Sequence, residues 1–413
     1  MTSRRSSNPT NLTVVGLQWG DEGKGKVVDY LADGHDAVAR FNGGSNAGHT
    51  VVIGREKHTF HLVPSGAMKG KRLFIGAGVA LDPQILSEEL TALRGHGTRV
   101  NLRIDGRCTL VSPLEKEFDE FIEGQRGPLA LGTTKRGIGP AYAMRALRLS
   151  PRAADLFTTF DMTPITRFYS RIGLETKKFV AWLDAARETL NGMLADVGAE
   201  VDGICDRGGS VLFEGSQGTL LDLLHGSYPY VTSSHTIATY LPASLGVPAS
   251  RIGKVLGVAK CYTTRVGEGP FPSEIRGTLG SRMRELGREY GATTGRPRRV
   301  GWLDLVALKY AVRVNGVDEI ALSKVDVLAK LRQLRVCVAY RIDGSETSDF
   351  QRSIGHLDEV EPVYESPANL HGAIFEGEVP AEVMKLVDYM ERALRVKIAL
   401  VSFGDERSET VEL

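Results

Sequence analysis

The sequence predicts an α/β fold in which a large, mostly parallel central sheet is flanked by helices. Short apolar runs bounded by turn residues alternate with stretches of helical periodicity, which is the pattern of strands joined by crossover helices. Of the 413 residues, 42% are hydrophobic and 24% are charged, which is ordinary for a chain with a sizeable core. The 47 glycines exceed the usual share and indicate many sharp turns or close backbone approaches.

The elements follow from this alternation. Asp82 and Pro83 open a helix as its N-cap and first-turn residue, and other periodic stretches predict helices at Val27–Ala32, Trp302–Val314 and Ala381–Leu394. The apolar runs predicted as strands are Leu12–Leu17, Ala37–Phe41, Leu73–Gly76, Val211–Phe213, Lys254–Val258, Glu319–Leu322 and Lys397–Val401.

The chain is predicted to be one α/β domain, residues 12–413, with a helical subdomain inserted at about 151–208. No strand is expected in that insertion, and its apolar residues Phe179, Leu183, Leu190 and Leu194 are expected on one helical stripe. Residues 1–11 are polar, basic and Ser-rich, and predict a disordered tail, with a vestigial transit segment as the alternative.

Charge and cysteine content exclude several classes of protein. The formal net charge is +1, so no whole-chain field attracts nucleic acid or anionic membranes, and no apolar run is long enough to span a membrane. Four cysteines are scattered without a Cys-x-x-Cys pair, which disfavours a zinc cage and a disulfide framework. A cytoplasmic protein is the resulting expectation.

A glycine loop after the first strand points to phosphate binding. Residues Gly20-Asp21-Glu22-Gly23-Lys24-Gly25-Lys26 fit G-x-x-x-x-G-K between a strand and a helix. Such a loop aims backbone N–H groups and a helix N-terminus at phosphates. A plain strand-to-helix turn is the alternative interpretation.

Two neighbouring residues suggest chemistry at this loop. Val27 replaces the hydroxyl residue that usually holds Mg²⁺, so Asp21 becomes the candidate metal ligand, general base, or both. His49 lies in a second glycine-rich turn, 42–50, and is a candidate general acid. A structural hydrogen-bonding role is the alternative for this histidine.

A second motif, after the strand at 319–322, is typical of guanine recognition. In Lys324-Val325-Asp326 the carboxylate can accept from guanine N1–H and the 2-amino group, while adenine offers an acceptor at N1 and is rejected. A surface ion pair is the alternative for the isolated motif, but together with the phosphate loop it predicts GTP, as in P-loop GTPases. Ser402-Phe403-Gly404 follows the last strand and is expected to close the base pocket.

Three further segments exceed what a GTP switch needs. They are 132–140, 213–234 and 291–299, and the last carries three arginines and two threonines. Guanidinium groups bind carboxylates with two parallel bonds, which suits a small carboxylate substrate. Nucleic acid is disfavoured because stacking aromatics do not accompany the arginines. Plain surface loops are the alternative for each segment.

Taken together, from Val14 to Gly404, these motifs closely resemble the adenylosuccinate synthetase family. The resemblance implies a GTP-dependent ligase that joins IMP and L-aspartate through a 6-phosphoryl-IMP intermediate, releases GDP and phosphate, and serves AMP biosynthesis in the de novo purine pathway. It also implies one Mg²⁺ per subunit, GTP as co-substrate, and a homodimer in which Arg148 reaches the partner's site.

The resemblance also implies a role for each matching residue. The residues expected to act in catalysis are Asp21, His49, Gln217 and Lys24. The metal ligands are expected to be Asp21 and Gly48. GTP binding falls to Gly20, Asp21, Glu22, Gly23, Lys24, Gly25, Lys26, Gly48, His49, Thr50, Arg298, Lys324, Val325, Asp326, Ser402, Phe403 and Gly404. IMP binding falls to Asp21, Glu22, Gly23, Lys24, Asn46, Ala47, Gly48, His49, Thr134, Arg148, Gln217, Thr232 and Arg296, and aspartate binding to Ala292, Thr293, Thr294, Gly295, Arg296, Pro297 and Arg298.

Two alternative functions stay open at this point. One is a viral branch that couples a guanine nucleotide to aspartate; that branch lacks the loop aspartate, so Asp21 counts against it. The other is a GTP-binding switch without ligase activity, which the arginine loop and the segment from Gln217 to Thr232 disfavour.

Overall fold

The computed structural model describes residues 10–53, 56–291 and 295–413. In these residues, ten strands form one sheet: β1 (Leu12–Gly16), β2 (Ala37–Arg40), β5 (Arg72–Ile75), β7 (Asn101–Asp105), β9 (Leu194–Ala195), β10 (Val211–Glu214), β11 (Lys254–Lys260), β15 (Glu319–Ser323), β19 (Lys397–Ser402) and β20 (Thr410–Glu412). Their order across the sheet is β20-β19-β15-β11-β1-β10-β2-β5-β7-β9. Every neighbouring pair is parallel except β19 with β20, so the predicted mostly parallel sheet is confirmed.

Successive residues of the central strands enter different cores on the two faces of the sheet. Val15 and Phe213 belong to one buried cluster, whereas Val14 and Leu212 belong to another. Because side chains alternate along a strand, an uninterrupted apolar run is what a sheet covered on both faces requires. The predicted strand runs are therefore confirmed, with ends that differ by a residue or two.

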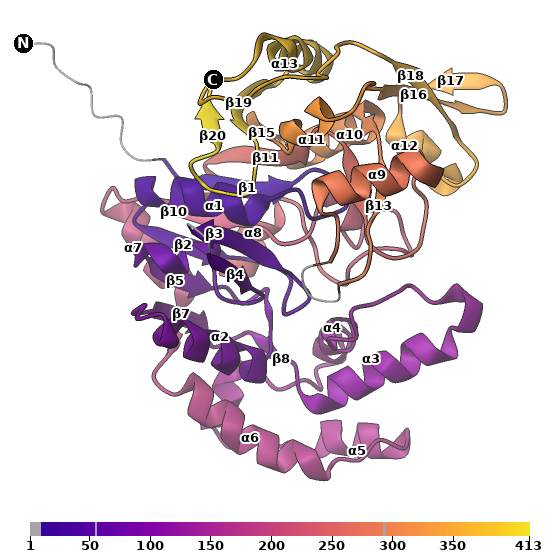
Figure 1. Ribbon diagram of the computed structural model, residues 1–413. Coiled ribbons are helices and arrows are strands. Elements are labelled where there is room, and N and C mark those ends of the chain that lie inside the picture. Colours follow the sequence, from indigo (N-terminus) through magenta and orange to yellow (C-terminus); the bar gives the residue numbers. More distant parts are fainter. Residues whose placement is uncertain (1–9, 54–55, 292–294) are drawn as a thin grey trace, which may run out of the picture.

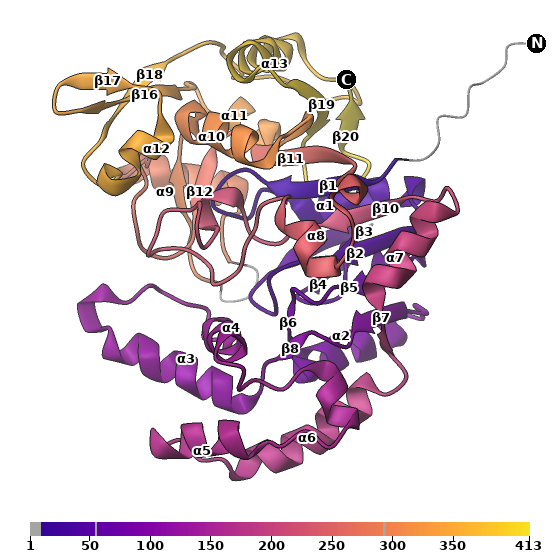
Figure 2. The same cartoon turned by 180° about the vertical axis from the view of Figure 1, so that it is seen from behind.

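Helices cover both faces of this sheet (Figures 1 and 2). Asp82 caps α2 by accepting from the N–H groups of Gln84 and Ile85, as the sequence predicts, and Asp304 caps α10 by accepting from Ala307 N–H. The covering helices are α1 (Lys24–Leu31), α2 (Pro83–Gly95), α7 (Val197–Asp206), α8 (Tyr240–Leu245), α9 (Gly277–Gly287), α10 (Leu305–Asn315), α11 (Val325–Ala329) and α13 (Ala381–Leu394).

A group of helices stands apart from the sheet in both views of the ribbon (Figures 1 and 2). It comprises α3 (Pro113–Gln125), α4 (Ile138–Ala146), α5 (Thr163–Arg171) and α6 (Lys177–Leu190). The group therefore begins before residue 151, earlier than the predicted insertion. Its inner side chains, Tyr169 and Phe179 among them, are buried in the core that also contains Leu86 of α2.

The expectation that no strand lies within 151–208 is wrong. Strand β9 pairs with β7 at the edge of the main sheet, and α7 packs beside β10 and β7. Leu194 lies in β9, so it does not extend the helical stripe that Phe179, Leu183 and Leu190 form on α6. A two-residue strand carries too little alternation to be recognised in a sequence.

Smaller sheets and hairpins lie outside the ten-stranded sheet. Strands β3 (His49–Ile53) and β4 (Glu56–Phe60) form a hairpin, β12 (Thr263–Arg265) pairs with β13 (Arg299–Gly301), and β6 (Ala80–Leu81) pairs with β8 (Thr109–Leu110). A further sheet contains β14 (Leu303–Asp304), β16 (Val336–Ile342), β17 (Ser345–Thr347) and β18 (Glu361–Glu365), beside the short helix α12 (Phe350–Ser353).

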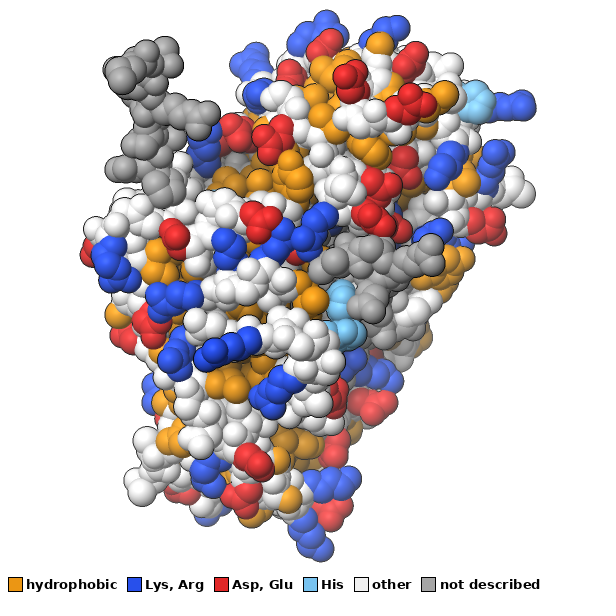
Figure 3. Space-filling model, turned by 60° about the vertical axis from the view of Figure 1, so that its left-hand side comes forward, with side chains coloured by type: hydrophobic (Ala, Val, Ile, Leu, Met, Phe, Trp, Pro, Cys, Tyr) orange, Lys and Arg blue, Asp and Glu red, His pale blue; other side chains and the backbone are white. Residues whose placement is uncertain are grey.

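Asn11, which the sequence assigns to the tail, is fixed in the fold. Its amide donates to Arg251 O at 2.8 Å, and its oxygen accepts from Val211 N–H at 2.8 Å. Within the described part of the chain, no helix has the length and apolar character needed to cross a bilayer. Figure 3 shows basic and acidic side chains interspersed over the face in view, as the balanced charge of the sequence suggests.

Candidate active site

Six neighbouring strands carry the predicted site. The order β19-β15-β11-β1-β10-β2 is continuous and parallel, so the loops after these strands leave from the same edge of the sheet. They contain the base segments 402–404 and 323–326, the phosphate loop 20–26, the 215–232 segment and the 42–50 turn. Ligands of open α/β sheets bind at this carboxyl edge.

The phosphate loop has the predicted arrangement of strand, glycine turn and helix. Gly20 (φ 83°), Asp21 (φ 59°) and Gly23 (φ 92°) all adopt left-handed backbone conformations. The carboxylate of Glu22 is fully buried and accepts from the N–H groups of Gln18 (3.0 Å) and Gly20 (2.9 Å). Lys24 Nζ lies 2.5 Å from the other Glu22 oxygen, so the loop is braced from within.

The Asp21 carboxylate lies in a chain of charged groups. Arg298 Nε is 2.7 Å from Asp21, and Arg298 also donates to Glu289 at 2.6 Å. Glu289 accepts from Lys260 Nζ at 3.1 Å and from the Tyr262 hydroxyl at 2.5 Å. Burial by itself raises the pKa of Glu289, but the charges of Lys260 and Arg298 outweigh burial and lower it to about 2.

His49 forms a buried pair with Glu214, at the end of β10. The imidazole Nδ1 contacts Glu214 Oε1, and the carboxylate also accepts from Ser65 N–H (2.8 Å) and Ser65 Oγ (2.6 Å). Burial lowers the pKa of His49, which favours a neutral ring with its proton on Nδ1 toward the carboxylate. His49 Nε2 is buried without a partner among the described residues, and such an atom suits a ligand.

Three of the predicted IMP residues touch one another. Gln217 donates to Asn46 Oδ1 at 3.1 Å, and Asn46 donates to Thr232 Oγ1 at 3.2 Å. Gln217 has φ 58°, and its Oε1, like His49 Nε2, is a buried atom without a hydrogen-bond partner in the described structure. The structure thus brings together side chains from three separate segments.

Arg296 lies against the segment that contains Thr134. Its guanidinium donates to the carbonyl oxygens of Gly132 and Thr133, both at 3.2 Å. Gly295 and Pro297 belong to the same turn, in which Gly291 N–H donates to Arg296 O at 2.8 Å. The predicted aspartate residues Ala292, Thr293 and Thr294 lie outside the described residues.

The base motif occupies the start of α11. Lys324 has φ 62°, and its ammonium donates to Asp405 at 2.9 Å. Asp326 Oδ1 accepts from Gly404 N–H at 3.2 Å, so the 402–404 segment does lie beside the motif, as predicted. Ser323 Oγ donates to Glu22 O at 2.6 Å and ties the base end to the phosphate loop.

The histidine end is tied to the same loop. A Cβ at Gly25 would lie 3.1 Å from His49 Cβ, so the glycine lets the 42–50 turn pack against α1. Arg148, by contrast, is exposed after α4 with φ 60°, and no described contact joins it to these groups.

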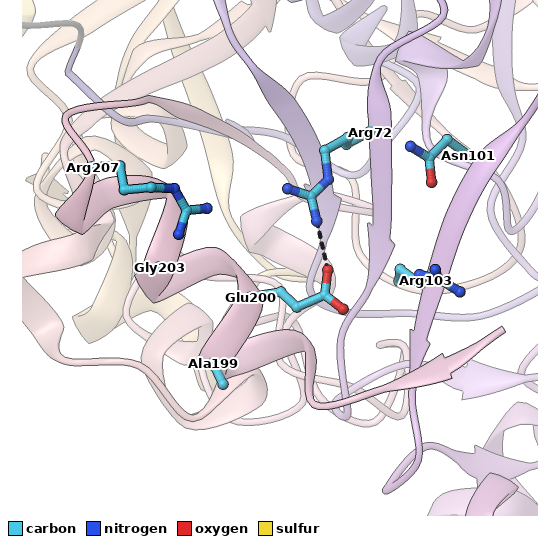
Figure 4. A pocket seen from close by; sticks show the side chains of 7 residues that line it. All are labelled: Arg72, Asn101, Arg103, Ala199, Glu200, Gly203 and Arg207. Atoms are coloured by element: carbon cyan, nitrogen blue, oxygen red, sulfur yellow. Dashed lines mark hydrogen bonds and ion pairs between the residues drawn. The ribbon is translucent and has the colours of Figure 1, made fainter.

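A cavity of about 630 Å³ lies away from this edge of the sheet. Figure 4 shows its lining, with Arg72 bonded to Glu200. Arg72 and Asn101 are the first residues of β5 and β7, so this cavity opens at the amino ends of the strands. It holds none of the predicted site residues, and its volume therefore does not mark the active site.

Sequence reasoning missed the supporting residues Glu214, Ser65, Glu289 and Lys260. Glu214 lies within the 213–234 segment, which was noted for its glycines. Glu214 and Ser65 both lie too far from His49 in the sequence to form a recognisable motif with it. Lys260 and Glu289 come from β11 and from the turn after α9. A charged residue at the end of an apolar strand, as Lys260 and Glu214 are, was the available signal.

Among the described residues, no three His, Cys, Asp or Glu side chains are grouped as a metal site. The donor set at the phosphate loop still fits Mg²⁺, which is usually held by one or two carboxylates together with phosphate oxygens. Asp21 supplies a carboxylate, which already lies beside a positive charge, that of Arg298. Gly48, the residue before His49, supplies a backbone carbonyl as the second oxygen ligand.

The fold and the site define a nucleotide-dependent ligase of the α/β class. A family model described as adenylosuccinate synthetase matches residues 13–411, and the chain belongs to the adenylosuccinate synthetase family. It is accordingly a ligase that uses GTP to join IMP and aspartate in AMP biosynthesis. The resemblance stated from the motifs is confirmed.

Individual relatives agree with this assignment. The chain is 44% identical to adenylosuccinate synthetase of Moorella thermoacetica, covering 97% of this chain and 98% of that one. It is 43% identical to the enzyme of Thermodesulfovibrio yellowstonii, with the same coverage. The fully ligated Plasmodium falciparum structure matches with a TM-score of 0.88 and 30% identity, over 98% of this chain and 100% of that chain.

A viral structure shares the fold alone. The succinoaminodeoxyadenylate synthetase of cyanophage S-2L, bound to dGMP and dATP, matches with a TM-score of 0.66 and 21% identity, over 98% of this chain and 95% of that chain.

Proposed function

We propose that the chain performs the ligation in two steps, through 6-phosphoryl-IMP, with Asp21 and His49 as the proton-transferring residues. The observation that carries this proposal is that the phosphate loop contacts both other parts of the site: Glu22 O accepts from Ser323, and Gly25 packs against His49. One loop therefore lies between the base motif and the histidine.

In the first step, the γ-phosphoryl group of GTP passes to O6 of IMP. Asp21 takes the N1 proton of IMP, which pushes electron density toward O6 and makes it a better nucleophile. His49 faces the transferred group with Nε2, and the negative charge of the triphosphate favours the protonated ring, which Glu214 stabilises. The loop N–H groups and Lys24 neutralise charge that moves during transfer.

In the second step, the aspartate amine attacks C6 and phosphate leaves. An oxo group on a purine is a poor leaving group, and phosphorylation turns it into a good one. As the amine adds to C6, N1 becomes basic and Asp21 returns to it the proton taken in the first step, so Asp21 can then accept the proton that the amine loses; the N1 proton is lost as phosphate leaves. Products are adenylosuccinate, GDP and phosphate.

Binding roles follow the predicted groups. IMP would take Asn46, Gln217 and Thr232, whose amides and hydroxyl already form one polar cluster with an unpaired Gln217 oxygen. Thr134 and Arg296 come from segments in contact, and Arg298, one of the predicted aspartate-binding residues, lies beside Asp21. Lys324 and Asp326 would hold guanine.

Mg²⁺ would be held by Asp21 and by the carbonyl of Gly48, with phosphate oxygens completing its shell. When bound it supplies positive charge to the β- and γ-phosphates. For Asp21 to serve it, the Arg298 guanidinium must leave the carboxylate or share it, since both cations need the same oxygens.

A homodimer is the proposed assembly, with Arg148 entering the partner's site. Arg148 is exposed, and the neighbouring Leu147 is 56% exposed, an apolar side chain of the kind that a partner surface would cover. Mixing inactive Arg148→Ala chains with inactive Asp21→Asn chains should restore about a quarter of wild-type activity, because random pairing leaves one intact site in half of the dimers. No recovery after demonstrated subunit exchange would contradict a shared site.

The cytoplasm is the proposed location. All four cysteines are free thiols, which is usual for proteins of a reducing compartment.

The decisive assay incubates the protein with GTP, IMP, aspartate and Mg²⁺ and follows product absorbance, with each component omitted in turn. Product formation that needs all four supports the proposal. Product formed with dGMP in place of IMP would favour the viral-type acceptor, and GTP hydrolysis without ligation would favour a switch.

A further inference from the structure

One lysine of the phosphate loop points away from where its motif places it. In G-x-x-x-x-G-K loops the final lysine reaches the β- and γ-phosphates. Here that residue is Lys26, and its ammonium instead donates to three backbone carbonyls: Phe403 O at 2.9 Å, Glu409 O at 3.0 Å and Gly404 O at 3.4 Å. These bonds use all three of its donors.

The carbonyls belong to the loop 403–409 between β19 and β20, which borders the base motif. Its Gly404 N–H donates to Asp326 at 3.2 Å, and its Asp405 accepts from Lys324 at 2.9 Å. Both side chains proposed to read guanine are therefore oriented by this one loop.

Besides Lys26, a few contacts hold this loop in the described structure, among them an ion pair of Asp405 with Arg288 at 3.5 Å. Arg407 pairs with the buried Asp29 of α1 at 2.9 Å, and Phe403 stacks on Phe375 with ring centroids 4.9 Å apart. Gly404 has φ 60°, and a Cβ there would lie 2.1 Å from the Glu409 carboxylate, so the turn is tight. Lys26 is thus one of two described contacts that tie the loop to helix α1, the other being Arg407 with Asp29.

We propose that Lys26 is a positioning residue for guanine recognition: through the carbonyls of Phe403, Gly404 and Glu409 it holds the 403–409 loop so that Asp326 and Lys324 face the base. This inference rests on the proposed use of GTP and adds to it that Lys26 acts on the base and not on the phosphates. Burial lowers the pKa of Lys26 to about 8, while Glu409 opposes that change, which agrees with an ammonium enclosed by the loop.

The test compares GTP with ITP, whose base lacks the 2-amino group, in the Lys26→Met variant. Methionine keeps the length of the side chain and removes its donors. Asp326 is expected to accept two hydrogen bonds from guanine but only one from hypoxanthine. A displaced Asp326 would therefore reduce the preference for GTP over ITP. We expect the ratio of kcat/KM for GTP to that for ITP to fall about tenfold, the KM for GTP to rise, and the kcat at saturation to change less than threefold.

A phosphate-binding lysine would behave differently. Loss of a phosphate contact would lower kcat and kcat/KM by the same factor for GTP and ITP, leaving their ratio intact, and that result would overturn the inference. An unchanged ratio with unchanged kinetics would overturn it as well. A wild-type protein that makes no product with GTP would instead contradict the proposed function.

Two further variants complete the experiment. Arg407→Met loosens the same loop at its other anchor and should shift the ratio in the same direction by a smaller factor. Lys254→Met removes a lysine that pairs with Glu319 at the opposite ends of the strands and should leave the ratio unchanged. Equal melting temperatures of the Lys26→Met variant and its wild type exclude global unfolding as the cause; should Lys26→Met fail to fold, the Arg407→Met result decides.

Discussion

The two ends of the site are built differently. At the catalytic end, Glu22, Glu214 and Glu289 have side chains no more than 1% exposed, and each is bonded to a cation or an imidazole. At the guanine end, the Lys324 and Asp405 side chains are 26% and 47% exposed, and the Asp326 side chain is 22% exposed. The first end is braced by buried charge, the second by a surface loop.

The difference follows from position in the sheet. The catalytic loops leave β1, β10 and β2 in the middle of the sheet, whereas the base segments follow β15 and β19, and β19 lies next to the edge strand β20. Buried ion pairs hold geometry because breaking one leaves a charge unpaired in a medium of low dielectric. Exposed pairs contribute little by themselves. Changes at the catalytic end should therefore alter turnover, and changes at the guanine end should alter selectivity.

The largest effect is expected from Asp21→Asn. Asparagine cannot accept the N1 proton and offers Mg²⁺ no full charge, so turnover should be nearly abolished while the fold and much of the nucleotide binding persist. Retention of a tenth of the wild-type rate, a loss of only ~1.4 kcal/mol, would remove Asp21 from the base role. Asp33→Asn, on the exposed turn after α1, is the matched control and should keep full activity.

Next comes Glu214→Gln, which tests whether buried charge prepares His49. The amide cannot stabilise the imidazolium, so kcat should fall about a hundredfold with little change in the KM for GTP. Steady-state kinetics at saturating IMP and aspartate would measure this. A decrease under threefold would assign the pair to structure alone.

A smaller and different effect is expected from Asp326→Asn at the guanine end. One acceptor becomes a donor that faces the 2-amino group of guanine, at a cost of about 1–3 kcal/mol, so use of GTP should weaken by roughly ten- to a hundredfold. XTP, which carries oxygen there, should become the preferred donor, and the KM values for IMP and aspartate should hardly move. Equal preference for GTP and XTP would return Ser323–Asp326 to a surface ion pair, and Lys330→Ala, the exposed partner of Asp326, serves as control.

The smallest effect on turnover is expected at Asp304, outside the site, where the change is in stability. Burial raises the pKa of Asp304 from 3.8 to about 6. Between these two pH values the folded protein therefore keeps a proton on Asp304 that the unfolded chain has released. Stability from this group is present below about pH 4 and is lost as the pH rises to about 6, by about 3 kcal/mol. Asp304→Asn keeps a capping oxygen for α10 but does not titrate. Urea unfolding should show its destabilisation shrinking from pH 4 to pH 7; a constant difference would contradict the buried titration.

Local sequence patterns predicted much of this molecule. Apolar runs located the strands, and Asp82-Pro83 located a helix start to the residue, because caps and periodicity are local properties. One strand, β9, was missed, since it is only two residues long and is defined by its partner β7. The division into domains and the roles of the site residues stay predictions.

Residue types at short, fixed spacing were enough to predict the fold class, the phosphate loop, the Lys-x-Asp motif and the family. Only the tertiary structure decided which charges meet: Glu214 with His49, Glu289 with Lys260 and Arg298, and Lys26 with the carbonyls of a loop 377 residues along the chain. The physical reason is that a buried charge requires a partner in space, and the sheet supplies it by aligning the ends of strands that are distant in sequence.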